Sequence, residues 1–537
     1  MTMSFYGRRG MAVAPHSLAA ESAVAVMREG GNAIEAMVAA AATIAVVYPH
    51  MNSIGGDGFW VIRGPKGVAG GIDAAGHSAA LASIDSYAKD RGITGSIPFR
   101  GGNAALTVAG TVAGWGRALD LARSVGGRMP LSRLLEDAIW YADHGVPVTH
   151  GQHKRVVAKF DELSPVAGFA ETFLVDGVVP KENALFKQPR LAQTLRTIAK
   201  KGCDDFYRGG LARDNAADLE RLGSPIRLND LQSYQARLVN PLTIQTTLGR
   251  LWNMTPPSQG LVSLTILGIM DRLAQQSPRG LDDPMSARFV HAQVEATKQA
   301  FLVRDQHLTD PAFMSVSPES LLAPSRLDAM AAAIDWDRAA PWGKALDPGD
   351  TIWMGALDQS GIAVSFIQSI YHEFGSGIVL PSTGVNWQNR GCGFSLNPAH
   401  INRLEPRKRP FHTLNAGLTE TSDGRVMVYG TMGGDGQPQT QACIYSRVMR
   451  FGLDPQAALE MPRWLLGRTW GNPSDTLKLE SRFPSETVAN LKALGHDVEM
   501  LEAMDESVGH AGAIVREKSG LLVGGFDPRS NGGVAAF

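Results

Sequence analysis

The sequence predicts an α+β fold in which a central pair of sheets is covered by helices. Two observations lead to this prediction. Helical patterns dominate the first part of the chain, whereas strand-like alternation of apolar and polar residues dominates the part after residue 350. In addition, the segment of residues 32–48 is apolar on every face, so it must lie buried between layers.

The expected helices have recognisable ends. Residues 17–29 predict a helix that a pair of glycines ends. The next helix begins after Asn32, because Asn32 and Glu35 have the spacing of a capping box, and it ends before a proline at residue 49. Residues 131–338 carry amphipathic helices and proline-containing loops. We expect them to form an outer helical layer and a lobe beside it.

The expected strands come in pairs joined by turn residues. Residues 58–63 and 68–73 flank a Gly-Pro-Lys-Gly turn, and two strands after residue 350 flank the turn of residues 358–361. The remaining expectations are strands at residues 425–430 and 511–515 and helices at residues 440–451 and 485–494.

Composition fits a large enzyme with a substantial core. The chain has 537 residues, of which 44% are hydrophobic and 19% are charged. A net charge of −1 gives no electrostatic reason to expect binding to nucleic acid or to an anionic membrane. The most apolar segment, residues 36–48, is too short to span a bilayer. The three cysteines lack pairing or metal-type spacing, and the N-terminus has no apolar signal stretch, so we expect a cytoplasmic protein.

Thr351 is the candidate nucleophile. It follows the turn sequence Asp-Pro-Gly-Asp and opens a strand-like run, so a cut of the Asp350–Thr351 peptide bond would make it the first residue of a new chain. A terminal threonine carries its own base, because an α-amine with a pKa of about 7.7–8.0 lies beside the hydroxyl. Taken alone, a threonine that opens a strand is usually there for its β-propensity.

Sequence blocks on both sides of Thr351 change that interpretation. They span nearly the whole chain and read, in order, Gly10-Met11-Ala12-Val13-Ala14-Pro15-His16, Glu29-Gly30-Gly31-Asn32-Ala33-Ile34-Glu35-Ala36, Pro49-His50-Met51-Asn52-Ser53-Ile54-Gly55-Gly56-Asp57-Gly58-Phe59, Phe374-Gly375-Ser376-Gly377, Lys408-Arg409-Pro410, Met432-Gly433-Gly434 and Asp527-Pro528-Arg529-Ser530. Together these blocks resemble the gamma-glutamyltransferase family of N-terminal nucleophile (Ntn) hydrolases.

The resemblance implies a four-layer αββα sandwich built from both halves of a self-cleaved precursor. Residues 1–350 would form the large alpha subunit, and residues 351–537 the small beta subunit that begins with Thr351. The two pieces would remain together as a heterodimer, with a dimer of heterodimers left open. The family chemistry requires no metal or organic cofactor.

The resemblance also assigns the catalytic groups. Gly433 and Gly434 match the family's oxyanion-hole glycines, whose N–H groups stabilise the developing negative charge. Ser369 lies where the family has a hydroxyl near the terminal amine, so we expect it to hydrogen-bond Thr351. Without the resemblance, the glycines would be read as a strand-to-helix turn and Ser369 as an ordinary strand serine.

Departures from the family pattern bear on the substrate. Ala75 occupies the position of the arginine that clamps the α-carboxylate of a glutamyl substrate, and Gly393 replaces the aspartate that holds its α-amino group. Tyr371 replaces an asparagine after the second strand. The groups that recognise the amino-acid end of a glutamyl substrate are therefore largely absent.

Other residues at the same site favour a compact monocarboxylate amide. Arg390 stands where relatives have a neutral residue, and a guanidinium can hold a carboxylate through two parallel hydrogen bonds. His412 and Thr413 replace paired serines, which brings a histidine donor into the pocket. Within the family the pattern most resembles the oxamate amidohydrolase branch of purine-degrading bacteria, which converts oxamate to oxalate and ammonia. A gamma-glutamyltransferase or glutathione hydrolase, a cephalosporin-type acylase and a silent binding scaffold remain open as alternatives.

Overall fold

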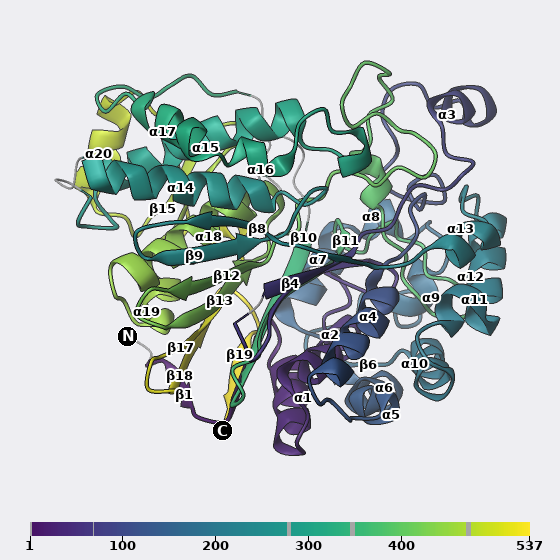
Figure 1. Ribbon diagram of the computed structural model, residues 1–537. Coiled ribbons are helices and arrows are strands. Elements are labelled where there is room, and N and C mark those ends of the chain that lie inside the picture. Colours follow the sequence, from purple (N-terminus) through teal and green to yellow (C-terminus); the bar gives the residue numbers. More distant parts are fainter. Residues whose placement is uncertain (1–2, 68, 277–280, 344–349, 469–473) are drawn as a thin grey trace.

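Two large sheets form the centre of the molecule. The computed structural model describes residues 3–67, 69–276, 281–343, 350–468 and 474–537. Within them, two seven-stranded antiparallel sheets lie face to face, and helices cover the outer face of each (Figure 1). The αββα sandwich expected from the sequence is therefore confirmed.

Both sheets combine strands from the two sides of residue 350. In spatial order the first sheet contains β19 (Gly533–Ala536), β2 (Gly10–Ala14), β10 (Asp350–Asp358), β11 (Ala363–Tyr371), β3 (Asp57–Arg63), β4 (Ala69–Ala74) and β7 (Arg237–Val239). The second contains β1 (Phe5–Gly7), β18 (Leu522–Phe526), β17 (Ala511–Arg516), β13 (Val426–Thr431), β12 (Gly417–Thr421), β9 (Gly249–Asn253) and β8 (Leu242–Gln245). Neither sheet is complete without residues from both halves of the chain.

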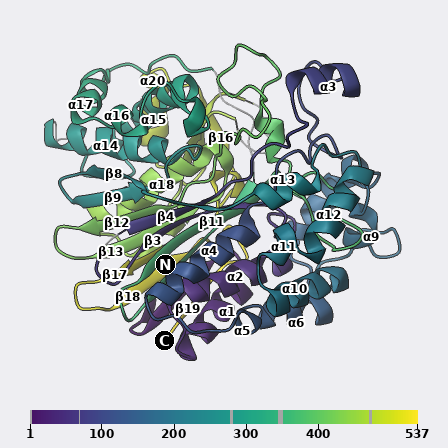
Figure 2. The same cartoon turned by 45° about the vertical axis from the view of Figure 1, so that its right-hand side comes forward.

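Helices form the two outer layers, which Figure 2 shows on opposite sides of the strands. The layer on the first sheet includes α1 (Ser17–Arg28), α2 (Ala33–Val47), α4 (Thr111–Ser124), α6 (Glu136–His144) and α10 (Pro189–Lys201). The layer on the second includes α14 (Gly260–Gln276), α15 (Ala287–His307), α17 (Pro324–Ala332), α18 (Gln437–Tyr445) and α19 (Pro455–Glu460). Among the described helices, none combines the length and the apolar character needed to cross a bilayer.

Shorter elements complete the chain. The remaining α-helices of the described residues are α3 (Ile84–Arg91), α5 (Leu131–Leu134), α7 (His150–Ala158), α8 (Phe160–Leu163), α9 (Phe169–Phe173), α11 (Asp205–Arg208), α12 (Gly210–Arg221), α13 (Leu228–Ser233), α16 (Pro318–Leu321) and α20 (Ser485–Ala493). Two small sheets contain β5 (Val146–Pro147) with β6 (Leu185–Phe186), and β14 (Trp464–Leu466), β15 (Leu477–Glu480) and β16 (Val498–Leu501).

Helix α2 has the position that its sequence predicts. The Asn32 side chain accepts hydrogen bonds from the N–H groups of Ile34 and Glu35, and the Glu35 carboxylate accepts the Asn32 N–H, which completes the capping box. All fifteen residues of α2 are buried, because it lies between the first sheet and the helices α4 and α6. This helix packs against β10 and β11 of the first sheet.

The predicted strand pairs form, but the middle of the chain contains more strands than expected. Strands β7, β8 and β9 fall within residues 131–338, where the sequence indicated helices and loops. They have only three to five residues each, too few to show a clear period. The helix expected at residues 440–451 begins earlier, at Gln437, and continues as a π-helical segment, Ser446–Arg450. Residue 68, the first residue of the strand expected at residues 68–73, lies outside the described residues.

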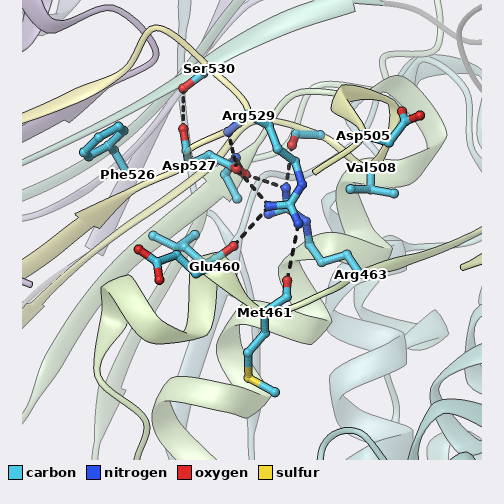
Figure 3. A network of polar contacts seen from close by, with 12 residues as sticks. Glu460, Met461, Arg463, Asp505, Val508, Phe526, Asp527, Arg529 and Ser530 are labelled. Carbon is cyan, nitrogen blue, oxygen red and sulfur yellow. Dashed lines mark hydrogen bonds and ion pairs between the residues drawn. The ribbon is translucent and has the colours of Figure 1, made fainter. Parts of the chain in front are cut away.

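The Asp-Pro-Arg-Ser block near the C-terminus is a buried charge network (Figure 3). Asp527 accepts a hydrogen bond from Arg463 at 2.5 Å and one from Arg529 at 3.0 Å, and Arg529 also bonds Glu480 at 2.6 Å. These four side chains are completely buried. Asp527 also accepts the N–H of Ala511, the first residue of β17. The block therefore ties the C-terminal segment to the second sheet and to β15.

Candidate active site

Thr351 lies at an irregularity in the first sheet. The pairing of β10 with β11 shifts register between Asp350 and Ile352, and Thr351 is the residue in between. Such a bulge re-aims a side chain out of the regular alternation. The Thr351 side chain is fully buried, and β10 runs without interruption through the Asp350–Thr351 peptide bond. The Asp350 side chain lies outside the described part of the structure.

Among the described residues, two side chains contact the Thr351 hydroxyl. Its Oγ1 lies 3.4 Å from Ser369 Oγ, and Gln437 Nε2 donates to it at 3.3 Å. Ser369 Oγ also accepts the N–H of Tyr371 at 2.8 Å, which fixes the serine beside the threonine. Catalytic hydrogen bonds are often this long before a substrate is bound. The predicted contact between Thr351 and Ser369 is present, whereas Gln437 received no role from the sequence, although it lies close to the Gly433-Gly434 block.

Gly433 and Gly434 form the turn between β13 and α18. Their φ angles are 114° and 53°, in the left-handed region that favours glycine. Gln259 Nε2 donates to the Gly434 carbonyl at 2.8 Å and fixes the turn. Within the described residues, the N–H groups of the two glycines have no hydrogen-bond partner. Because α18 begins at Gln437, which contacts Thr351, these free donors lie at the nucleophile's end of the helix.

Arg390 is buried beside the same strand end. Its guanidinium carbon lies 3.5 Å from the centroid of the Tyr371 ring, and Nη2 donates to Thr413 Oγ1 at 3.1 Å. Nη1 is 3.5 Å from the Phe411 carbonyl, and Nε has no partner in the described structure. Burial lowers the pKa of Arg390 from its usual value, but a guanidinium remains charged at neutral pH. Arg390, Tyr371 and Thr413 therefore lie together, and Arg390 Nε is left as a donor for an anion.

His412 is also buried, and it contacts a carboxylate that the sequence analysis did not single out. Its Nε2 lies 2.9 Å from Asp57 Oδ2, and its Nδ1 has no partner among the described residues. Asp57 stands opposite Ser369 in the pairing of β3 with β11. It belongs to the Gly-Gly-Asp-Gly block, so a signal existed, but residue type alone gave it no role. Burial raises the pKa of Asp57 to about 7, and burial together with Arg390 lowers the pKa of His412 well below its usual value.

The site thus combines groups of the kind that acyl transfer uses: a buried hydroxyl, two glycine N–H groups without partners among the described residues, and a guanidinium with an unpartnered Nε. A family model, gamma-glutamyltranspeptidase, matches residues 19–537. The chain belongs to the gamma-glutamyltranspeptidase family. It is thus an enzyme of a family that acts on amide C–N bonds, and the Ntn-hydrolase resemblance drawn from its sequence blocks is confirmed.

Individual relatives cover the whole chain. The chain is 55% identical to the oxamate amidohydrolase proenzyme of Klebsiella pneumoniae, over 100% of both chains. It is 38% identical to the glutathione hydrolase-like YwrD proenzyme of Bacillus subtilis, over 99% of each chain. Among solved structures, the cephalosporin acylase from Bacillus halodurans superposes with a TM-score of 0.90 at 32% identity, covering 100% of this chain and 97% of that one.

Ala75 and Gly393, where the sequence departs from the family pattern, offer no side chain that could bind the carboxylate or the amino group of a glutamyl substrate. Ala75 is buried, and its N–H donates to Asp73, whose other oxygen is paired with Arg409. A Cβ atom at Gly393 would meet no atom within 4 Å, so this position borders open space. Arg390 therefore remains as the buried cation that borders Tyr371 at the strand end.

Proposed function

We propose that the chain cuts itself between Asp350 and Thr351 and then hydrolyses a small carboxylate amide, with oxamate as the substrate. The observation that carries this proposal is the placement of Arg390, which packs on the ring of Tyr371 at the end of β11 and has an Nε–H without a partner among the described residues. Oxamate has one carboxylate next to one amide, so it suits a site with one cation and one nucleophile. The name of the relative at 55% identity supports the same substrate.

The proposed cut follows from the position of Thr351. Its hydroxyl attacks the carbonyl carbon of Asp350, and the peptide C–N bond breaks as the acyl group passes to Oγ1 and the nitrogen takes up the hydroxyl proton, which frees the Thr351 amine. Water then hydrolyses the resulting ester, which releases the Asp350 carboxylate and restores the hydroxyl. The names of both relatives describe proenzymes, which supports a processing step.

Turnover would use the same atoms. Thr351 Oγ attacks the amide carbon of the substrate while its proton passes to the α-amine, and the N–H groups of Gly433 and Gly434 hold the oxyanion. The C–N bond then breaks, the protonated amine gives its proton to the leaving nitrogen, and ammonia departs from an oxalyl ester on Thr351. The same amine deprotonates a water molecule, which hydrolyses the ester to oxalate. Arg390 holds the carboxylate throughout, while Ser369 and Gln437 hold the threonine.

Matured protein should release ammonia from oxamate and little p-nitroaniline from a gamma-glutamyl anilide. Thr351→Ala should run as one full-length band on a denaturing gel and be inactive. Arg390→Ala should still be cut, but its KM for oxamate should rise roughly 10- to 100-fold, as expected for the loss of charge-assisted hydrogen bonds. Turnover of the anilide alone would favour the glutathione hydrolase alternative and contradict the proposal.

The place of the enzyme in the cell is part of the same proposal. Oxamate turnover fits a late step in purine degradation, as the resemblance to the oxamate branch implies. Cys203, Cys392 and Cys443 form no disulfide among the described residues, which suits a reducing cytoplasm. Cell fractionation with an activity assay tests this assignment.

A further inference from the structure

The His412 ring is fixed in place on several sides. Its backbone N–H donates to the Pro257 carbonyl at 2.8 Å, and its carbonyl accepts the N–H of Gln259 at 2.9 Å. The ring packs edge-on against Phe59, with centroids 5.0 Å apart, and Nε2 contacts Asp57. Only 1% of the residue is exposed. Its Nδ1, which has no partner among the described residues, therefore points in a fixed direction.

The surroundings of Asp57 determine which nitrogen of His412 carries the proton. Asp57 Oδ1 accepts three hydrogen bonds, from the N–H groups of Gly76 at 2.9 Å and Gly110 at 3.1 Å and from Gln388 Nε2 at 3.0 Å. A carboxylate with this many donors is an acceptor, so Oδ2 accepts the Nε2–H of His412. Neutral imidazole has one proton, which leaves Nδ1 with a lone pair. The free nitrogen of His412 is therefore an acceptor, not the donor expected from the sequence.

Adding one proton to the Asp57–His412 pair reverses the role of Nδ1. If the proton resides on Asp57, its O–H donates to Nε2 and the imidazole proton moves to Nδ1. If the proton resides on the imidazole, both nitrogens carry hydrogen. In either case Nδ1 becomes a donor, whichever group is assigned the proton. Burial raises the pKa of Asp57 to about 7, so this change falls in the neutral range.

Charged and titratable groups on several elements face this pair. The charges and polar groups that act on Asp57 or His412 are Arg390, Arg409, Asp73, Tyr207 and Tyr234. Two of them, Arg390 and Arg409, are cations that lower the pKa of His412 beyond the effect of burial and so disfavour the imidazolium. Above neutral pH, the two cations and the buried donors around Asp57 all favour an ionised Asp57 and a neutral His412.

Two buried nitrogen atoms at the site are thus unpaired and opposite in character: Arg390 Nε is a donor and His412 Nδ1 is an acceptor. Arg390 contacts both residues that flank His412, through the Phe411 carbonyl and Thr413 Oγ1. Buried polar atoms without partners are unfavourable, so a bound ligand that pairs both is stabilised. A primary amide next to a carboxylate offers the matching groups, an N–H and an anionic oxygen.

We propose that His412 Nδ1, held as an acceptor by Asp57, receives an N–H of the unsubstituted amide whose carboxylate Arg390 binds, so that the site selects primary amides. Asp57 is then a positioning residue that acts through His412. This inference rests on the proposed function, because it assigns the amide group of that same substrate. N-substituted amides lose one N–H and gain a carbon, so they fit this acceptor less well.

Paired variants of His412 test the acceptor role. The glutamine side chain in His412→Gln places an amide at the position of Nε2 and retains the contact with Asp57, but it removes the Nδ1 acceptor. His412→Asn places an amide oxygen near Nδ1. We expect wild-type protein to prefer oxamate over N-methyloxamate by roughly tenfold or more in kcat/KM. His412→Gln should abolish this preference, and His412→Asn should retain part of it.

The Asp57→Asn variant tests the positioning role through a pH profile. Its Nδ2–H can donate to His412 Nε2 and so drive the proton onto Nδ1 at every pH. We expect kcat/KM for oxamate to fall roughly tenfold and the inflection near pH 7 to disappear. The Thr351 amine titrates in both proteins, so the difference between the two profiles isolates Asp57. A denaturing gel that shows the normal cut confirms that each variant folds.

Histidine nitrogen NMR separates this inference from the proposed function. The spectrum of ¹⁵N-histidine-labelled protein at pH 8, with the His412 signal assigned by its loss in His412→Gln, should show a bare Nδ1 and a protonated Nε2. Finding the proton on Nδ1 would overturn the inference whatever the substrate is. An unchanged amide preference in His412→Gln would also overturn it. If wild-type protein showed a bare His412 Nδ1 but did not turn over oxamate, that result would count against the proposed function and not against the protonation state of His412.

Discussion

At the residue scale, two buried carboxylates show how neighbours decide ionisation. Asp57 and Asp527 are both completely buried, yet their pKa values shift in opposite directions. Asp57 is surrounded mainly by neutral donors, and burial raises its pKa to about 7. Burial acts in the same direction on Asp527, but direct contact with Arg463 and Arg529 lowers its pKa to about 2. One carboxylate can titrate near neutrality, whereas the other is a permanent structural charge.

The Asp527 network should make a measurable contribution to stability. Arg463→Ala leaves a buried carboxylate short of one cation, and we expect the free energy of unfolding to fall by about 3–5 kcal/mol. The contribution of Asp527 is present above its unfolded pKa of about 3.9 and is lost as the pH falls toward its folded pKa of about 2. Urea titrations at pH 7 and at acidic pH check both statements.

The matched control for Arg463→Ala is Arg425→Ala, which removes the exposed ion pair with Asp423. Exposed pairs contribute little, so this change should cost less than about 1 kcal/mol. If both variants lost the same free energy of unfolding, burial would not be what makes the Asp527 network strong.

At the scale of elements, short local signals determine where helices begin. The capping box of Asn32 and Glu35 is visible in the sequence and is formed in the structure. The bulge at Thr351 gives no such signal, because it depends on how β10 pairs with β11. The cap of α2 can therefore be predicted from the chain alone, whereas the direction of the Thr351 side chain cannot.

Removing the cap should destabilise α2 and the layer around it. Asn32→Ala leaves the N–H groups of Ile34 and Glu35 without their acceptor, at a cost of about 1 kcal/mol. Asn32→Ser keeps a capping oxygen, so its free energy of unfolding should stay within a few tenths of a kcal/mol of the wild-type value. The midpoint of urea unfolding measures the difference. An alanine variant as stable as the serine variant would contradict this role of Asn32.

At the scale of the whole molecule, each of the two central sheets contains strands from both proposed pieces. Strands β10 and β11 lie between β2 and β3 in the first sheet, and β8 and β9 extend the second sheet beside β12. The core between the sheets includes Met11 and Phe59 from the first piece and Trp353, Val428 and Ile514 from the second. Separating the pieces would expose this core to water.

The proposed cut should therefore leave the molecule intact. Matured protein should show two bands on a denaturing gel but a single species by native mass spectrometry, at about the 57.4 kDa of one chain or at twice that for a dimer of heterodimers. Thr351→Ala should give the same native species with one band. Pieces that separate on a sizing column without denaturant would contradict the shared core.

The sequence by itself determined the family, the α+β class and the buried helix α2. It also placed Ser369 beside Thr351, but it gave no role to Gln437. These features depend on local patterns: a capping box, apolar runs, glycine pairs and residue blocks in a fixed order. Short strands such as β7 were missed because three residues show no period.

Only the tertiary structure decided how the site groups meet. The Asp57–His412 contact joins residues 355 positions apart, and Gln437 reaches Thr351 from another sheet's helix layer. A linear sequence carries the identity of these side chains but not their distances. Burial and hydrogen-bond partners, which set the charge of Asp57 and the free nitrogen of His412, exist only once the two sheets have packed together.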